Sequence, residues 1–159
     1  MICEKVIGTT KDNRFQNKAI DYVDIDWYEA FKKLHKKRTR NGKEIGIRLG
    51  NDILTKGLKQ EDVLYVEERE IIAVNIRPSQ MILVDIHKDH PYMLGKVCYE
   101  IGNKHAALFW GKDHTQVQTP YNQPTLNQLR KLHGITCSVE KVKPDLSRNI
   151  STSVNEHTH

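Results

Sequence analysis

The chain has 159 residues, of which 38% are hydrophobic and 28% are charged, and its formal net charge is +5. This composition allows one domain or two small ones with modest apolar cores. No apolar run approaches the roughly 18 residues of a membrane span, and the N-terminus lacks a signal-peptide core, so we expect a cytoplasmic protein. Cys3, Cys98 and Cys137 are widely spaced without a Cys-x-x-Cys pair, which argues against a thiolate zinc site and favours core packing.

The first half of the chain consists of short apolar runs separated by turn residues, a pattern typical of β-strands. Asp26 precedes a segment that favours a short helical turn with Asp26 as its cap. Asn41-Gly42 is a strong hairpin signal between two of the expected strands. The expected strands are 2–7, 34–40, 43–49, 63–66 and 71–74. They predict a small antiparallel, β-rich N-terminal domain over residues 1–77, with Arg77-Pro78-Ser79 as its boundary.

The second half changes to strands that alternate with helices. Apolar residues recur at helical spacing through Ile101, and Gly102 is placed to end this helix. A second helix is expected over 125–134, and strands over 81–86, 106–110, 115–119 and 136–142. This order is that of a ferredoxin-like βαββαβ domain, here residues 78–143. Residues 144–159 lack apolar periodicity and are expected to form a flexible tail. The chain is therefore predicted to be an α+β protein of two small domains.

One dense basic run precedes the Asn-Gly turn. It consists of Lys32, Lys33, Lys36, Lys37, Arg38 and Arg40. In a strand these side chains alternate between two faces, which gives a mixed basic ribbon. The ribbon suits an acidic protein partner at least as well as nucleic acid. An RNA-binding domain of this class needs aromatic side chains on one sheet face, whereas Phe109 and Trp110 are adjacent and point to opposite faces.

Histidines supply the candidate metal ligands. His105 lies where the first predicted helix ends and a strand follows, and Glu156-His157-Thr158-His159 lies in the expected tail. Imidazole is a ligand for Ni(II), Cu(II) and Zn(II), but one imidazole does not hold a divalent ion usefully. A two-fold axis near His105 pairs two imidazoles in a homodimer, and His157 and His159 then complete the shell. A capping or core role for His105 is the alternative that the residues alone leave open.

Three segments occur in an order that resembles a known family. They are Glu44-Ile45-Gly46-Ile47-Arg48-Leu49 after the Asn-Gly turn, Glu61-Asp62-Val63-Leu64-Tyr65, and Glu100-Ile101-Gly102-Asn103-Lys104-His105. With a histidine-bearing tail, they resemble the UreE family of urease accessory proteins over nearly the whole chain. The resemblance implies a β-rich N-terminal domain similar to the peptide-binding domain of heat-shock cochaperones, followed by a ferredoxin-like metal-binding domain. The resemblance favours a metal-binding role for His105.

The resemblance also implies a function. It indicates a nickel metallochaperone that is not itself an enzyme, carries Ni(II) as cargo with Zn(II) or Cu(II) able to substitute, and delivers it for assembly of the urease metallocentre. The implied partners are a second copy of the chain, the urease apoprotein and the urease accessory GTPase, without a membrane or nucleic acid. The alternative is a basic RNA- or protein-binding module with incidental metal binding. A metal-dependent hydrolase is disfavoured because no motif places Glu100 or Asp113 beside an ion.

This chain departs from the family pattern at three places. Lys104 replaces the usual arginine before His105, Glu61 replaces the glycine of a Gly-Asp pair, and Tyr121-Asn122-Gln123 replaces extra histidines of some relatives. Lysine does not reproduce a bidentate arginine contact, so the role of Lys104 has to be established separately. Imidazole binds metal only when neutral, so nickel binding should weaken as the pH falls through about 6.5.

The remaining histidines are given structural or solvated roles. His87 and His90 lie three residues apart at an expected helix entry, and a role at the helix start is favoured over the alternative of weak metal binding. His114 is expected in a hairpin turn, and His35 and His133 are expected to be structural or solvated.

Overall fold

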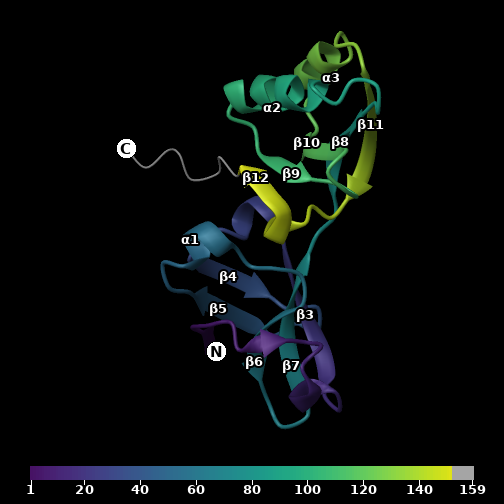
Figure 1. Cartoon of the computed structure of the whole chain (residues 1–159). Coiled ribbons are helices and arrows are strands. Elements are labelled where there is room, and N and C mark those ends of the chain that lie inside the picture. The colour runs from purple at the N-terminus through teal and green to yellow at the C-terminus, as the bar shows by residue number, and fades with distance from the viewer. Residues whose placement is uncertain (152–159) are drawn as a thin grey trace. The chain divides into compact units, whose positions relative to one another are not determined.

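The computed structural model describes residues 1–151, which fold into two compact units that meet in sequence between Arg77 and Pro78 (Figure 1). We refer to residues 1–77 as the first unit and to residues 78–151 as the second. The secondary structure is mixed α+β, as the sequence predicts. Within residues 1–151, no helix combines the length and the apolar character that membrane crossing requires.

The first unit contains two sheets. Its strands are β1 (Ile2–Cys3), β2 (Gly8–Thr9), β3 (Ala19–Ile25), β4 (Leu34–Arg38), β5 (Glu44–Arg48), β6 (Asp62–Val66) and β7 (Glu70–Ile76). Its helical segments are η1 (Asn13–Phe15), η2 (Trp27–Glu29) and α1 (Ile53–Lys56). The strand orders are β1-β5-β4 and β2-β6-β7-β3. The expected turn after Asp26 is present as η2, and the Asp26 backbone N–H donates to the Glu29 carboxylate.

The expected hairpin is confirmed, but the expectation of a wholly antiparallel unit is wrong. β4 and β5 pair antiparallel across a turn in which Gly42 has φ 89°. In contrast, β3 pairs parallel to β7, and β1 pairs parallel to β5. The strand β3 was not expected, because Asp21 and Asp24 interrupt its apolar pattern. Asp21 is nevertheless buried, and its carboxylate accepts a hydrogen bond from the Asn41 backbone N–H at 3.1 Å.

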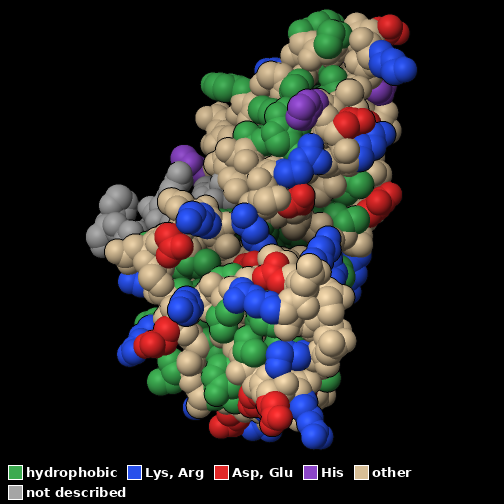
Figure 2. All heavy atoms as spheres, turned by 60° about the horizontal axis from the view of Figure 1, so that its bottom comes forward, with side chains coloured by type: hydrophobic (Ala, Val, Ile, Leu, Met, Phe, Trp, Pro, Cys, Tyr) green, Lys and Arg blue, Asp and Glu red, His purple; other side chains and the backbone are tan. Residues whose placement is uncertain are grey.

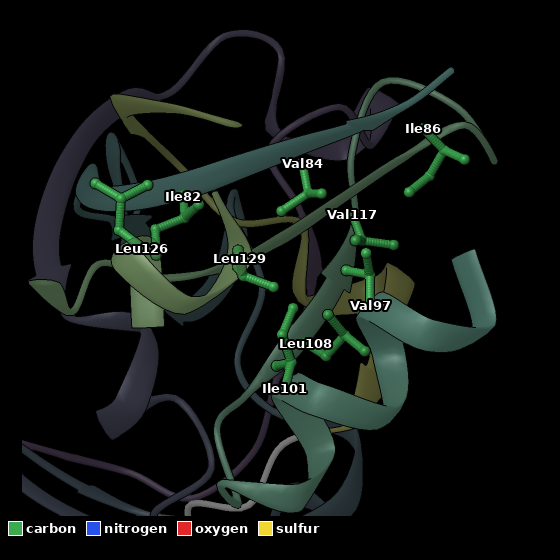
Figure 3. Packing of buried hydrophobic residues seen from close by; sticks show 9 residues of the cluster. All are labelled: Ile82, Val84, Ile86, Val97, Ile101, Leu108, Val117, Leu126 and Leu129. Carbon is green, nitrogen blue, oxygen red and sulfur yellow. The ribbon is translucent and has the colours of Figure 1, made fainter. Parts of the chain in front are cut away.

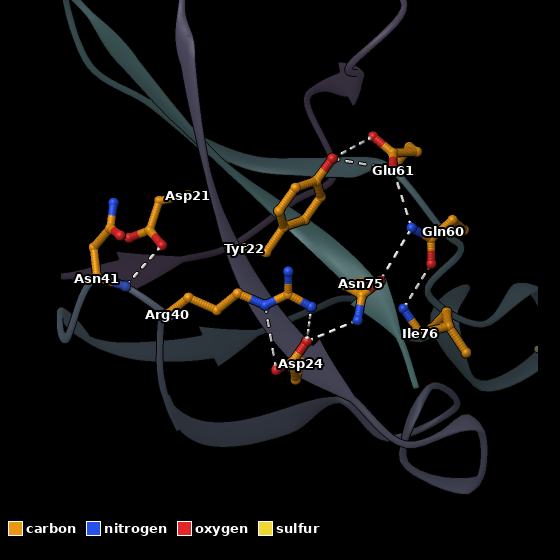
Figure 4. Close-up of polar contacts among 9 residues, drawn as sticks. All are labelled: Asp21, Tyr22, Asp24, Arg40, Asn41, Gln60, Glu61, Asn75 and Ile76. Atoms are coloured by element: carbon orange, nitrogen blue, oxygen red, sulfur yellow. Dashed lines mark hydrogen bonds and ion pairs between the residues drawn. The ribbon is translucent and has the colours of Figure 1, made fainter. Parts of the chain in front are cut away.

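A polar network joins separate elements of the first unit (Figure 4). Asn75 on β7 donates to Asp24 on β3 at 2.7 Å, and Arg40 reaches the same carboxylate at 2.8 Å. Gln60 donates to Asn75 at 3.3 Å and to Glu61 at 3.0 Å. These bonds connect β3 and β7 of one sheet with Arg40 in the β4–β5 turn of the other, so they help to fix how the two sheets approach one another.

The second unit contains one sheet and two helices. Its elements are β8 (Ser79–Ile86), α2 (Met93–Asn103), β9 (Leu108–Trp110), β10 (Gln116–Pro120), α3 (Gln123–Leu129), β11 (Ile135–Val142), η3 (Leu146–Arg148) and β12 (Asn149–Ser151). The strand order is β11-β8-β10-β9-β12, and every pairing is antiparallel. The Asn122 side chain caps α3 by accepting from the Thr125 N–H at 3.1 Å.

Both helices of the second unit pack on the same face of its sheet (Figure 3). Alternate residues of a strand share a face, so Ile82, Val84 and Ile86 of β8 point together toward the helices. Val97 and Ile101 of α2 lie against them and are fully buried. The remaining members of this cluster are Leu108, Val117, Leu126 and Leu129. This core holds the end of α2 in a fixed position beside β9.

The expectation of a flexible tail from residue 144 onward is wrong for residues 144–151, which include η3 and β12. Leu146 is buried, and β12 adds to the edge of the sheet beside β9. The sequence pattern missed this strand because Asn149-Ile150-Ser151 pairs through its backbone, with few apolar side chains to mark it. Asp145 also caps η3, the helical turn that precedes β12, since its carboxylate accepts a hydrogen bond from the Ser147 N–H at 3.0 Å.

Candidate metal site

His105 closes the C-terminus of α2. Its backbone N–H donates to the Gly102 carbonyl at 2.9 Å, and the Ala106 N–H reaches the Ile101 carbonyl at 3.4 Å. These two bonds form a Schellman motif, in which the residue at the His105 position takes the left-handed conformation. His105 has φ 55°. The prediction that Gly102 ends the helix is therefore wrong, because α2 continues to Asn103 and Gly102 lies in its last turn.

The residue type at this position is informative. A left-handed backbone favours glycine and costs an L-residue about 1 kcal/mol. His105 is also exposed, so its side chain does not fill the core. A histidine at a position where glycine is less strained, with its ring at the surface, points to a requirement for the imidazole itself.

The exposed face of α2 leads to His105. Tyr92 and Tyr99 are 69% and 64% exposed, and Gly95 and Gly102 lie between and after them at helical spacing. A Cβ atom placed on either glycine would meet nothing within 4 Å. This face is thus flat at the glycines and raised at the two tyrosines. This face was not predicted from the sequence, although tyrosine and glycine repeat along it at intervals of three and four residues, the spacing of one helix face.

Lys104 connects the end of α2 to the start of α3. Its Nζ lies 3.4 Å from the Thr125 Oγ1, within hydrogen-bond reach. One turn earlier, Gln128 of α3 donates to the Glu100 carboxylate at 2.9 Å. Lys96 forms an ion pair with the same carboxylate at 3.0 Å. Within residues 1–151, the Lys104 side chain therefore makes one hydrogen bond, which helps to position the residue beside His105.

The strand β12 brings the C-terminal part of the chain beside His105. Ser151 pairs with Leu108 on β9, and the two strands run antiparallel. Leu108 follows His105 by three residues. The described chain ends at Ser151, where β12 runs toward the His105 end of β9. His157 and His159, the other two predicted ligands, lie outside the described residues, and their relation to His105 is not tested.

The other histidines occupy different surroundings. His87 Nε2 lies 2.7 Å from Thr136 Oγ1, and the His114 ring packs against Trp110 with centroids 5.0 Å apart. His90 is half-buried and packs on Gly134, which has φ 79°. His35 Nε2 lies 2.9 Å from the Lys32 carbonyl, and burial lowers its pKa. No group of three or more His, Cys, Asp or Glu side chains within residues 1–151 is arranged to hold a metal ion.

The three cysteines behave as core residues. Cys3 is buried, whereas Cys98 and Cys137 are half-buried and pack against the core of the second unit. Burial raises the pKa of all three thiols. A raised pKa disfavours the thiolate, which is the form that binds a metal. The described part of the chain thus offers histidine rather than cysteine chemistry at α2.

Comparisons with known proteins are consistent across the chain. The family described as UreE urease accessory protein, N-terminal domain, matches residues 3–77. The urease accessory protein UreE of Helicobacter pylori strain G27 is 42% identical over 154 residues, covering 97% of this chain and 88% of the relative. The protein of the same name from Helicobacter acinonychis strain Sheeba is 40% identical over 154 residues, with the same 97% and 88% coverage. That of Acetivibrio thermocellus strain ATCC 27405 is 35% identical over 163 residues, covering 100% of both chains.

Proposed function

Because this chain belongs to the UreE family of urease accessory proteins, we propose that it is a homodimeric Ni(II) carrier with His105 at its metal site. The family consists of accessory chaperones that act in urease maturation, so the protein is not an enzyme. Ni(II) is the cargo, held by His105 from each copy together with His157 and His159, and delivered to the urease metallocentre. The exposed imidazole in the left-handed cap of α2 is the observation that carries this proposal.

The proposed dimer forms around the exposed face of α2. Two imidazoles are needed because one does not hold a divalent ion usefully, and a two-fold axis repeats each residue across an interface. Gly95 and Gly102 let a second helix approach closely, while Tyr92 and Tyr99 supply apolar area that is otherwise left in water. An axis crossing this face near its end would place the two His105 side chains together.

The tail histidines are within reach of that position. His157 follows Ser151 by six residues. An extended chain spans at most about 3.5 Å per residue, so this segment covers up to about 20 Å. Ser151 lies one strand away from Leu108, at roughly 5 Å, and the three residues back to His105 span about 10 Å at most. The tail therefore has the length to bring His157 or His159 to His105 of its own chain.

A site of this kind suits a carrier. Its ligands come from two copies and from a chain end, so they can leave the ion one at a time, unlike those of a closed four-ligand structural site. Imidazole ligands also bind Zn(II) and Cu(II), and copper binds more tightly than nickel. Selectivity would then depend on geometry and on metal supply in the cytoplasm, where we place the protein.

We further propose that the second unit is a ferredoxin-like domain. Its element order is strand, helix, strand, strand, helix, strand, its sheet order is β11-β8-β10-β9, and both helices pack on one face. The first unit would contact partners of the urease machinery, which by family membership are the urease apoprotein and the urease accessory GTPase. An RNA-binding role is less well supported, because Phe109 is fully buried and unavailable for stacking on a base.

Nickel titration by calorimetry, with molecular mass measured in parallel, tests the proposal. His105→Ala should abolish tight binding, and a truncation before His157 should weaken it partly.

His105→Gly separates binding from folding, because glycine removes the imidazole and also relieves the left-handed backbone. It should bind no tighter than His105→Ala yet be more stable by about 1 kcal/mol. His114→Ala, an exposed histidine elsewhere in the second unit, serves as the control. Equal nickel binding in all variants would refute the site.

A further inference from the structure

The outer face of the sheet β1-β5-β4 in the first unit carries both apolar and basic side chains that are exposed to solvent. On β4, Leu34, Lys36 and Arg38 are exposed, whereas His35 and Lys37 are half-buried on the other face. Exposed Leu34 and Ile2 retain 68% and 60% of their accessible surface. The outer face is therefore neither a buried packing surface nor a purely polar one. In Figure 2, hydrophobic side chains, in green, lie between basic and acidic ones in the lower half of the view.

Gly46 creates a notch in the middle of this face. Across the sheet, Gly46 pairs with Ile2 on one side and with Lys36 on the other. Arg48 pairs with Leu34 two residues further along the strands. Because Gly46 has no side chain, these four residues border a hollow of about 360 Å³. Its walls are apolar at Ile2 and Leu34 and cationic at Lys36 and Arg48.

The charges around the notch differ from those elsewhere in the basic run. Lys37 and Arg40 are committed to ion pairs with Glu29 at 2.7 Å and Asp24 at 2.8 Å. Lys36, by contrast, makes no ion pair within residues 1–151. Arg48 pairs with Glu4, but their side chains are 64% and 61% exposed, so this pair is weak and exchangeable. Two cations that are available to a partner, Lys36 and Arg48, thus lie beside the apolar notch.

We propose that this notch is a docking site for an extended acidic segment of a partner protein, which places one apolar side chain over Gly46 and a carboxylate between Lys36 and Arg48. The apolar anchor supplies affinity and the cations supply register and a faster encounter. This inference concerns the first unit and does not depend on nickel binding at His105.

Other occupants fit less well. A second copy of the same face would bring Lys36 and Arg48 against their own equivalents, so charge disfavours isologous pairing here. Single-stranded nucleic acid needs aromatic stacking partners, and none of the residues that line the notch is a phenylalanine, tyrosine or tryptophan. The mixture of apolar wall and free cation matches an amphipathic acidic peptide.

Fluorescence anisotropy with a fluorescein-labelled peptide of alternating glutamate and leucine tests this site in the full chain. Gly46→Val fills the notch, and a Cβ there meets nothing closer than 3.8 Å, so the fold should tolerate it. It should weaken binding by roughly tenfold or more at both low and high salt. Lys36→Glu should weaken binding by a similar factor at low salt and less at high salt. Lys11→Glu makes the same charge change at an exposed residue outside the notch and should have little effect.

Thermal melts of each variant show whether it is folded, and nickel titration shows whether the metal site is intact. Peptide affinity that is unchanged in both Gly46→Val and Lys36→Glu would overturn the proposal. So would a change in oligomeric mass in Gly46→Val, which would assign the face to a second copy. Displacement of the peptide by single-stranded RNA or anionic vesicles, with tighter binding of either, would equally overturn it.

Discussion

At the scale of single residues, the backbone indicates where side chains are needed. Glu61 has φ 71° and His105 has φ 55°, a conformation that residues other than glycine rarely adopt. For Glu61 the compensation is visible (Figure 4). Its carboxylate accepts hydrogen bonds from the Tyr22 hydroxyl at 3.1 Å, from Gln60 and from Thr10. Glycine would adopt this φ without strain, so the glutamate here accepts a strained backbone in return for a polar contact between β3 and the start of β6.

The positive φ of Glu61 predicts that a glycine variant at this position is more stable than an alanine variant. Glu61→Ala loses the hydrogen bonds and keeps the backbone strain, so it should lower the free energy of unfolding by about 1–3 kcal/mol. Glu61→Gly loses the same bonds but relieves about 1 kcal/mol of strain. Urea denaturation should therefore find the glycine variant more stable than the alanine variant. An alanine variant as stable as the wild type would show that the network contributes nothing.

At the residue scale, the helix α2 and the position of His105 after it could be predicted from the sequence, but the left-handed backbone of His105 could not. The helical spacing that ends at Ile101 identified α2, and its position before a strand singled out His105. The left-handed cap is defined by hydrogen bonds to the carbonyls of Ile101 and Gly102, which form only once α2 has folded. A glycine in the right neighbourhood was therefore mistaken for the cap.

At the scale of elements, an ion pair clasps β4 to η2. Lys37 donates to the Glu29 carboxylate at 2.7 Å, and the two side chains are 24% and 21% exposed. Burial raises the pKa of Glu29, but hydrogen bonds from Lys37 and from the Asp26 backbone outweigh it, so the pKa lies below its ordinary value. The ionised form of the Glu29 carboxylate therefore stabilises the folded state.

The clasp predicts part of the acid sensitivity of the first unit. A carboxyl group whose pKa is depressed by folding stabilises the fold above its unfolded pKa of about 4.3. That stability is lost as the pH falls through the lower, folded pKa. Glu29→Gln should thus reduce stability at pH 7 and flatten its decline below about pH 4.3. Glu44→Gln is the control, because Glu44 and Arg38 are each 66% exposed and their pair should contribute little. A matching effect in both variants would contradict the clasp.

Sequence reasoning succeeded for elements with local partners. The hairpin of β4 and β5 was expected because Asn41-Gly42 fixes the turn and the strands are adjacent in the chain. The parallel pairing of β3 with β7 was not, because it joins Ala19 to Glu70 and depends on burying Asp21 in a sheet. β12 was missed for the same reason, since its partner β9 lies far back in the sequence.

At the scale of the whole molecule, the proposed metal site is incomplete within one chain. The residue types of the proposed site could be read from the sequence. In the proposal, however, the second imidazole comes from another copy, and no spacing within one chain encodes a two-fold axis. The structure adds the exposed tyrosine and glycine face of α2 and the direction of β12, both of which converge on His105. If the proposed site is right, self-association is a requirement for tight nickel binding.

The link between dimer and metal can be broken without touching a histidine. Tyr99→Glu places a charge on the exposed face of α2, where burial against a second copy would leave that charge desolvated, so it should shift the protein to monomer. Tight nickel binding should fall with it, although His105 is intact. Tyr28→Glu replaces another exposed tyrosine in the first unit and should leave both properties unchanged. Analytical ultracentrifugation and nickel titration measure the two effects.

If Tyr99→Glu stays dimeric and binds nickel normally, the axis does not cross α2. If it is monomeric yet binds nickel tightly, His105 and the tail suffice within one chain, and the two-fold site is wrong.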